Sequence, residues 1–129
     1  MIVLDASAAL DWLLQTPAGG RIEHRIYSRN ETLHAPHLLD LEITQVLRSL
    51  VGQGAVSAKR AEQAVRDLLD LRINRHAHLL FLPRIWQLRH NFSMYDAAYI
   101  VLAETLSAVL VTRDRRLASA GHSATVEVF

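Results

Sequence analysis

Four acidic residues of this chain stand at places where an apolar fold has little reason to put a carboxylate. Asp5 ends the opening run "MIVLD", and Asp114 comes shortly after a second apolar run, "AVLVT". Glu42 lies at the edge of the apolar stripe of one predicted helix, and Asp96 lies within another helix that is otherwise apolar. Carboxylates brought together without a counter-ion repel one another, and a divalent cation removes that conflict. Because Mg²⁺ and Mn²⁺ prefer oxygen ligands, this set of residues favours a site for one of them.

The chemistry of such a site is metal-assisted hydrolysis of a phosphodiester. A metal held by a few carboxylates activates water and neutralises the charge that develops on the phosphate. No protein nucleophile is needed, and the chain has no cysteine, which excludes thiol nucleophiles and zinc–thiolate sites. None of the seven histidines forms an H-x-x-x-H pair with a glutamate between, and His76 with His78 indicates a polar turn or an edge strand.

Each of these acids also has a structural explanation when it is taken alone. Aspartate favours turns and helix caps, which would account for Asp5 and Asp114. Glu42 can extend outward from a boundary position. Asp96 ends an S-x-x-D sequence that is close to a capping box. The four together are harder to explain in this way. Asp40, by contrast, lies near the start of the helix that carries Glu42, where a negative charge interacts favourably with the helix dipole, and it is interpreted as structural.

The elements that must position these acids alternate along the chain. Apolar runs predict strands over residues 2–4, 32–36, 108–112 and 125–129, with a further short strand within 71–78. Helical spacing and caps predict helices over residues 8–14, 21–28, 39–51, 58–70, 83–89 and 93–106, with a loop at 16–20. Alternating strands and helices imply an α/β fold, in which helices cover both faces of a parallel sheet.

The expected sheet gives two of the acids a common location. In an open parallel sheet, ligands bind beyond the carboxyl ends of the strands, at the crevice where the strand order reverses. The strands that lead to Asp5 and Asp114 both end in this manner. If they are neighbours at that crevice, the two carboxylates face each other.

Length and composition set the remaining bounds. The 129 residues, half of them hydrophobic, predict a single domain over residues 1–129 with its own core. No apolar run is long enough to cross a membrane, and the absence of cysteine suits the reducing cytoplasm. The net charge is only +1, yet all but one of the 14 basic residues are arginine, the exception being Lys59. This bias suits a phosphate-bearing partner, although a GC-rich genome would explain it equally well.

Four ordered motifs resemble one known family. The segments "VLDASAAL", "LEITQVLRSL", "SMYDAAYIVLAE" and "VLVTRDRRLA" resemble the PIN-domain ribonucleases, in particular the VapC toxins of bacterial toxin–antitoxin pairs. The likeness extends over essentially the whole chain and implies a PIN-like three-layer sandwich, with a short central parallel sheet and helices on both faces. The resemblance implies that one acidic pocket holds one or two Mg²⁺ or Mn²⁺ ions on four residues: Asp5, Glu42, Asp96 and Asp114.

Other residues match the family less directly. Ser7 and Thr112 match hydroxyl positions beside the acids that help to orient ligands or substrate, but an N-cap role for Ser7 and a strand-end hydroxyl for Thr112 explain them as well. Arg113, Arg115 and Arg116 either contact RNA phosphates or form a solvated turn. Where the family's T-x-D motif often continues to Phe, this chain has Leu117, which affects packing more than chemistry.

The resemblance also implies a biological role. Proteins of this kind cut structured RNA such as transfer RNA or ribosomal RNA and so inhibit translation. They are commonly homodimers, and a VapB-type antitoxin covers their acidic pocket, which also allows a toxin–antitoxin hetero-oligomer. The alternative is a PIN-like module that binds RNA or protein without cutting it, although the presence of all four acids argues against it.

The sequence fits two other classes of protein poorly. A phospho-acceptor receiver domain needs a lysine near the phosphate, and Lys59 lies at the start of an ordinary helix. A haloacid-dehalogenase-like phosphatase needs a second aspartate two residues after the first, where this chain has a serine.

The aromatic residues Trp12, Tyr27 and Trp86 are interpreted as core residues in preference to an antitoxin groove or a dimer face.

Overall fold

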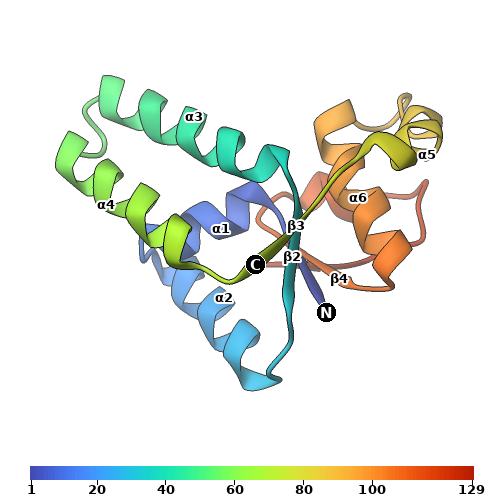
Figure 1. Ribbon diagram of the computed structural model, residues 1–129, viewed down its shortest axis with the longest axis horizontal. Coiled ribbons are helices and arrows are strands. Elements are labelled where there is room, and N and C mark those ends of the chain that lie inside the picture. Colours follow the sequence, from blue (N-terminus) through green and yellow to red (C-terminus); the bar gives the residue numbers. More distant parts are fainter.

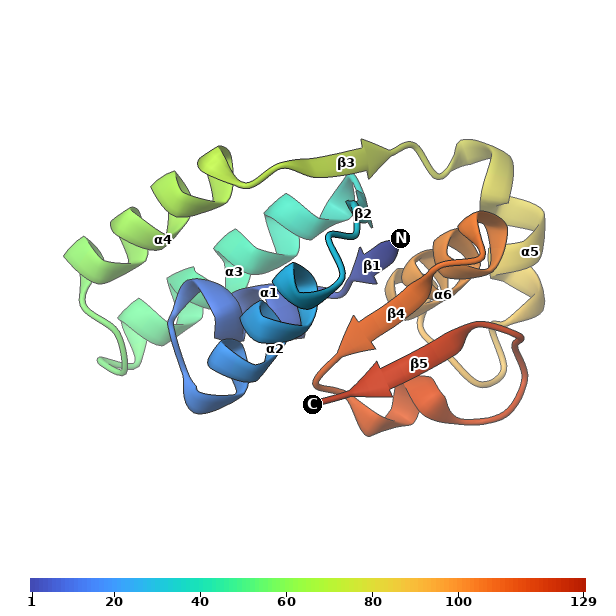
Figure 2. The same ribbon diagram turned by 90° about the horizontal axis from the view of Figure 1, so that it is seen from below.

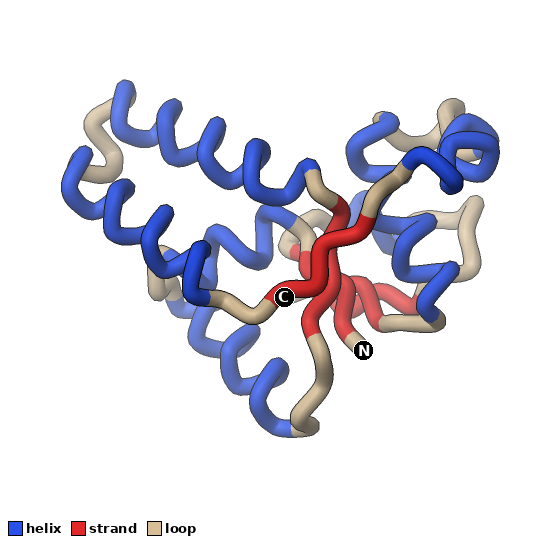
Figure 3. The backbone as a smooth tube through the Cα atoms, in the orientation of Figure 1, coloured by secondary structure: helices blue, strands red, loops and turns tan.

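The protein is a five-stranded parallel sheet between two layers of helices. A computed structural model describes all 129 residues. The sheet is seen almost edge-on in Figures 1 and 3, with α1 to α4 on one side and α5 and α6 on the other. Its strand order is β3-β2-β1-β4-β5, and every pair is parallel. The predicted fold class is confirmed.

The elements lie close to where the sequence predicts them. The strands are β1 (Ile2–Leu4), β2 (Leu33–Pro36), β3 (Ile73–His76), β4 (Val109–Thr112) and β5 (Thr125–Val128). The helices are α1 (Ala6–Leu13), α2 (Pro17–Ser28), α3 (Leu38–Gly52), α4 (Ala58–Asp70), α5 (Leu82–Gln87) and α6 (Met94–Leu106), with short 3₁₀ turns η1 (Leu79–Phe81) and η2 (Arg115–Ala118). None of these helices has the length and apolar character that crossing a membrane requires.

Strand β1 is the centre of the sheet because its side chains are apolar on both faces. Its three residues are completely buried, as expected of a strand that has helices above and below it. It pairs with β2 on one side and β4 on the other, so the strand order reverses between β1 and β4. Leu4 lies opposite Val111 in this register. The next residues along the two strands, Asp5 and Thr112, therefore emerge at the same edge of the sheet.

Helix α6 covers one face of the sheet, and α1 and α2 cover the other. Residues 97–103 of α6 are all buried, which is why this helix is apolar almost all round. Leu117 is buried in the core as well, so leucine fills the position at which the family often has phenylalanine. Helices α3 and α4 form an antiparallel pair that projects away from the sheet, at the opposite end of the molecule from α5 (Figure 2).

Two local predictions are wrong. The predicted loop at 16–20 is the first turn of α2, which begins at Pro17 and is capped by Thr16 Oγ1 accepting the Gly19 amide at 3.0 Å. Proline fits the first helical position because it needs no amide hydrogen there. Ser7 is not an N-cap, because α1 already begins at Ala6 and Ser7 lies within its first turn.

Gly19 is required by the close approach of α2 to α1, which predicts a large effect of a single methyl group. A Cβ atom at Gly19 would lie 2.0 Å from the carbonyl oxygen of Asp11, whereas a Cβ at Gly20 would meet nothing within 4 Å. We expect Gly19→Ala to lower the free energy of unfolding by about 2–3 kcal/mol, because the two backbones must separate. The matched change Gly20→Ala should raise it by up to about 1 kcal/mol through helix propensity. Urea denaturation measures both, and equal effects would contradict this packing.

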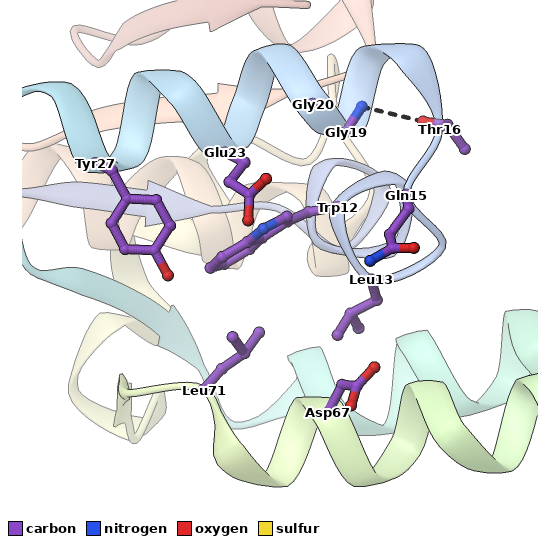
Figure 4. A pocket seen from close by; sticks show the side chains of 10 residues that line it. All are labelled: Trp12, Leu13, Gln15, Thr16, Gly19, Gly20, Glu23, Tyr27, Asp67 and Leu71. Carbon is purple, nitrogen blue, oxygen red and sulfur yellow. Dashed lines mark hydrogen bonds between the residues drawn. The ribbon is translucent and has the colours of Figure 1, made fainter.

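The aromatic residues are only partly in the core. Trp12 is buried, as predicted, but Tyr27 and Trp86 are 67% and 62% exposed. Tyr27 packs edge-on against Trp12 at the mouth of a cavity of about 330 Å³ (Figure 4). This cavity lies among α1, α2 and α4, and it contains none of the four acids that the sequence singles out.

Candidate active site

All four predicted acids line a single cleft of about 600 Å³ at the carboxyl end of the sheet. Asp5 follows β1, Glu42 is in α3, Asp96 is in the first turn of α6, and Asp114 follows β4. The strand neighbours β1 and β4 deliver the first and last of these from the switch point of the sheet. Four segments that are distant in sequence thus bring one acid each to the same cleft.

Asp5 is the most rigidly held of the four. Its side chain is buried, and its Oδ2 atom accepts hydrogen bonds from Ser7 Oγ and Thr112 Oγ1, each at 2.6 Å. Ser7 Oγ in turn accepts the Arg113 amide at 3.0 Å. Thr112 Oγ1 likewise accepts the Asp114 amide at 2.9 Å. The two hydroxyls fix one carboxylate oxygen of Asp5, and no protein group donates to the other, Oδ1.

Glu42 is held by Tyr99 of α6, a residue that the sequence motifs did not single out. Tyr99, completely buried in α6, donates its hydroxyl to Glu42 Oε1 at 2.9 Å. Burial raises the pKa of Glu42 above its usual range; the Tyr99 hydrogen bond opposes this rise, and the charges of Asp5 and Asp96 add to it. Burial also raises the pKa of Tyr99, which therefore stays a hydrogen-bond donor. The available signal was a phenol three residues after Asp96, on the same side of an otherwise apolar helix.

Asp96 is only partly explained by helix capping. Ser93 Oγ accepts the Asp96 amide at 3.1 Å, as in a capping box. The reciprocal bond, in which the Ser93 amide would donate to the Asp96 carboxylate, is not formed, and this carboxylate lines the cleft. Burial raises the pKa of Asp96, and the charge of Asp5 raises it further. The capping explanation therefore accounts for the amide and not for the carboxylate.

Asp114 differs from the other acids because a guanidinium donates hydrogen bonds to it. It is the N-cap of η2, and its carboxylate accepts both the backbone amide and the guanidinium of Arg116. This hydrogen bonding lowers the pKa of Asp114. Of the neighbouring arginines, Arg113 is paired with Asp11 at 2.6 Å and also donates to the Phe129 carbonyl, whereas Arg115 is exposed and has no side-chain partner.

The remaining polar groups near the site are structural. Asp40 is paired through both carboxylate oxygens with Arg75, each at 2.7 Å, as its structural interpretation predicts. His76 lies on the edge strand β3, and its Nε2 atom is 2.9 Å from His34 Nδ1. Neither Asp40 nor His76 lines the acidic cleft.

The acids suit a divalent cation by their chemistry. As the side chains stand, no three acids or histidines are grouped tightly enough to hold an ion directly. Yet the cleft offers hard oxygen donors, one free oxygen on a rigid Asp5, and two carboxyl groups, Glu42 and Asp96, whose pKa is raised by burial and by the charge of Asp5. Mg²⁺ keeps several of its waters and needs only a few carboxylates, so a looser arrangement of this kind fits it.

Comparison with known proteins gives matches along nearly the whole chain. A family model described as PIN domain matches residues 2–122. Ribonuclease VapC12 of Mycobacterium tuberculosis is 41% identical over 129 residues, which cover 99% of this chain and 98% of that protein. The crystal structure of PAE2754 from Pyrobaculum aerophilum aligns at 25% identity with a TM-score of 0.72, covering 97% of this chain and 81% of that one. The structure of Mycobacterium tuberculosis VapC20, described as a sarcin–ricin loop cleaving toxin, shares the fold at 16% identity with a TM-score of 0.67 over 95% and 97% of the two chains.

Proposed function

Because this chain belongs to the PIN-domain family and, within it, to the VapC ribonucleases, we propose that it is a Mg²⁺- or Mn²⁺-dependent endoribonuclease toxin. The observation that supports this most strongly is the convergence of four acids from four separate elements on one cleft. A protein that had kept the fold but lost the activity would have little reason to retain two carboxyl groups, Glu42 and Asp96, whose pKa is raised by burial and by the charges of neighbouring acids.

The residues of the cleft have two kinds of proposed role, to hold the metal and to position the residues that hold it. Asp5, Glu42, Asp96 and Asp114 would hold the metal, which when bound activates water and neutralises charge on the phosphate. Ser7 and Thr112 keep Asp5 Oδ2 in place, so that Oδ1 is presented at a constant position. Tyr99 holds Glu42 by its Oε1 atom. A water oriented by these acids would attack the phosphorus in line, so that one new P–O bond forms while the P–O bond to one ester oxygen of the RNA chain breaks, and no covalent intermediate with the protein is formed.

The proposed substrate is structured RNA, either transfer RNA or ribosomal RNA, and cutting it inhibits translation. VapC20, which shares the fold, is described as a sarcin–ricin loop cleaving toxin, and a ribosomal target for this chain agrees with that. In the metal-free structure Arg113 and Arg116 are paired with carboxylates, so Arg115 is the arginine of the turn that can contact RNA phosphates without first leaving an acid. We propose that residues 1–129 act as one catalytic domain in the cytoplasm. They would act as a homodimer or in a hetero-oligomer with a VapB-type antitoxin.

Mapping new RNA 5′ ends tests the enzymatic proposal against the binding-module alternative. After brief induction in cells, we expect new ends at discrete positions in one class of structured RNA. The purified chain should make the same cuts with Mg²⁺ or Mn²⁺, lose them in EDTA, and regain them when Mn²⁺ is added in excess. Growth inhibition without any new 5′ ends would contradict an endoribonuclease and favour a module that only binds.

A further inference from the structure

The guanidinium of Arg116 lies directly on the acid cluster. Its Nη2 atom is 2.5 Å from Asp114 Oδ2, and its Nε atom is 3.1 Å from each oxygen of that carboxylate. The same Nη2 atom is 4.0 Å from Asp96 Oδ2. The backbone amide of Arg116 adds a further bond to Asp114 Oδ1 at 2.9 Å. Both oxygens of one proposed metal ligand are thus already occupied, and a second ligand is within ion-pair distance.

This arrangement is specific to one of two adjacent arginines. Arg115 and Arg116 lie on the same 3₁₀ turn and are both exposed, Arg116 to 79% of its side chain. An exposed arginine gains little from a single ion pair, because water screens it and side-chain entropy opposes it. Arg116 nevertheless contacts the cleft acids, whereas Arg115 contacts no acid. Arg116 lies two residues after Asp114, where its backbone amide and its guanidinium both reach that carboxylate, and the guanidinium contacts both carboxylate oxygens.

We propose that Arg116 is the resident counter-cation of the acidic cleft, and that a divalent ion must displace its guanidinium from Asp114. This inference rests on the proposed function. The ion and the guanidinium compete for the same two carboxylate oxygens, so Arg116 weakens metal binding. Once displaced, the side chain is still anchored on the turn beside the cleft. There it pairs with a phosphate of the RNA, which guanidinium forks bind as readily as carboxylates. Arg116 therefore leaves Asp114 and contacts the substrate directly.

The first experiment measures Mn²⁺ binding to the full chain without RNA, by the electron paramagnetic resonance signal of free Mn²⁺. Parent protein, Arg116→Ala, Arg116→Lys and the matched control Arg115→Ala are compared. We expect Arg116→Ala to bind Mn²⁺ about three- to tenfold more tightly, since it removes a forked contact and not only a nearby charge. Arg116→Lys keeps the charge without the fork and should be intermediate. Arg115→Ala should change the affinity less than about twofold, because exposed charges out of contact are screened.

The second experiment measures RNA cleavage at saturating Mn²⁺. Arg116→Ala should raise KM for RNA even though it lowers the Mn²⁺ concentration needed for half-maximal rate. Opposite changes for metal and RNA are not expected of a residue that only stabilises the turn. Equal tightening of Mn²⁺ binding in Arg115→Ala and Arg116→Ala would overturn the inference and leave the proposed function standing, because general charge would explain it. Unchanged Mn²⁺ affinity in Arg116→Ala would also overturn it. If neither the parent protein nor any of the variants bound Mn²⁺, the inference and the proposed function would both fail.

Discussion

Replacing Asp5 by asparagine is expected to lower the rate of RNA cleavage in Mg²⁺ by about a thousandfold or more, an effect of roughly 4 kcal/mol on the barrier. The amide has the shape of the carboxylate, and its oxygen can still accept the hydroxyls of Ser7 and Thr112. What it lacks is the negative charge that the other oxygen of Asp5 presents to the cleft. The fold should therefore persist while the metal loses its most rigid ligand.

Single-turnover cleavage of a defined RNA, with circular dichroism of the same preparations, measures this prediction. Asp70→Asn is the matched control, because Asp70 is an exposed acid at the end of α4 and lies outside the cleft. It makes the same chemical change and should leave cleavage and fold as they are. An Asp5→Asn protein that cuts at the parental rate would show that the acids of the cleft do not hold the catalytic metal.

Sequence alone could place Asp5 and Asp114 because strand ends are a local property. An uninterrupted apolar run such as "IVL" must be buried on both faces, and the residue after it must emerge at an edge of the sheet. Parallel pairing then brings such residues to the same edge, which the β1–β4 register confirms. Glu42 and Asp96 could be predicted as interruptions of apolar helix faces for the same reason. Their shared cleft follows from the layer architecture.

The contacts that complete the site could not be predicted in this way. The bond from Tyr99 to Glu42 depends on how α3 and α6 dock on the sheet, and the position of Arg116 depends on a side-chain conformation in a short turn. Composition was also misleading at residues 16–20, where proline and glycine suggest a loop but serve helix initiation and close packing instead. Exposed Tyr27 and Trp86 show the same limit, since an aromatic residue at a helical position does not reveal whether another element covers it.

Replacing Glu42 by glutamine should stabilise the metal-free protein while it lowers activity. Burial, together with the charges of Asp5 and Asp96, raises the pKa of Glu42 above its ordinary value of 4.5. A carboxyl group whose pKa is raised on folding favours the folded state when it is protonated at low pH. That contribution is lost as the pH rises through the raised pKa. Removing the charge should therefore raise the free energy of unfolding at neutral pH, by less than about 1 kcal/mol because solvent screens a group that is only half-buried.

The control variant Glu104→Gln should show the opposite sign. Hydrogen bonds from Arg84 lower the pKa of Glu104, so its contribution to stability is present above its ordinary pKa and is lost as the pH falls through the lowered one. Glu104→Gln should therefore destabilise the protein at neutral pH. Urea denaturation at several pH values, in EDTA, distinguishes the two variants. Equal signs would contradict the assignment of Glu42 as a group in electrostatic conflict.

Adding metal should reverse the advantage of Glu42→Gln. A cation that binds only the folded state stabilises it in proportion to the logarithm of its concentration over Kd. Mn²⁺ should thus raise the Tm of the parent more than that of Glu42→Gln, which lacks one proposed ligand. Cleavage by the variant should fall about a hundredfold or more, because one carboxylate no longer supports the metal chemistry. The negative charges that destabilise the metal-free fold are then also the charges that bind a divalent cation. The substitution Glu42→Gln separates these two effects.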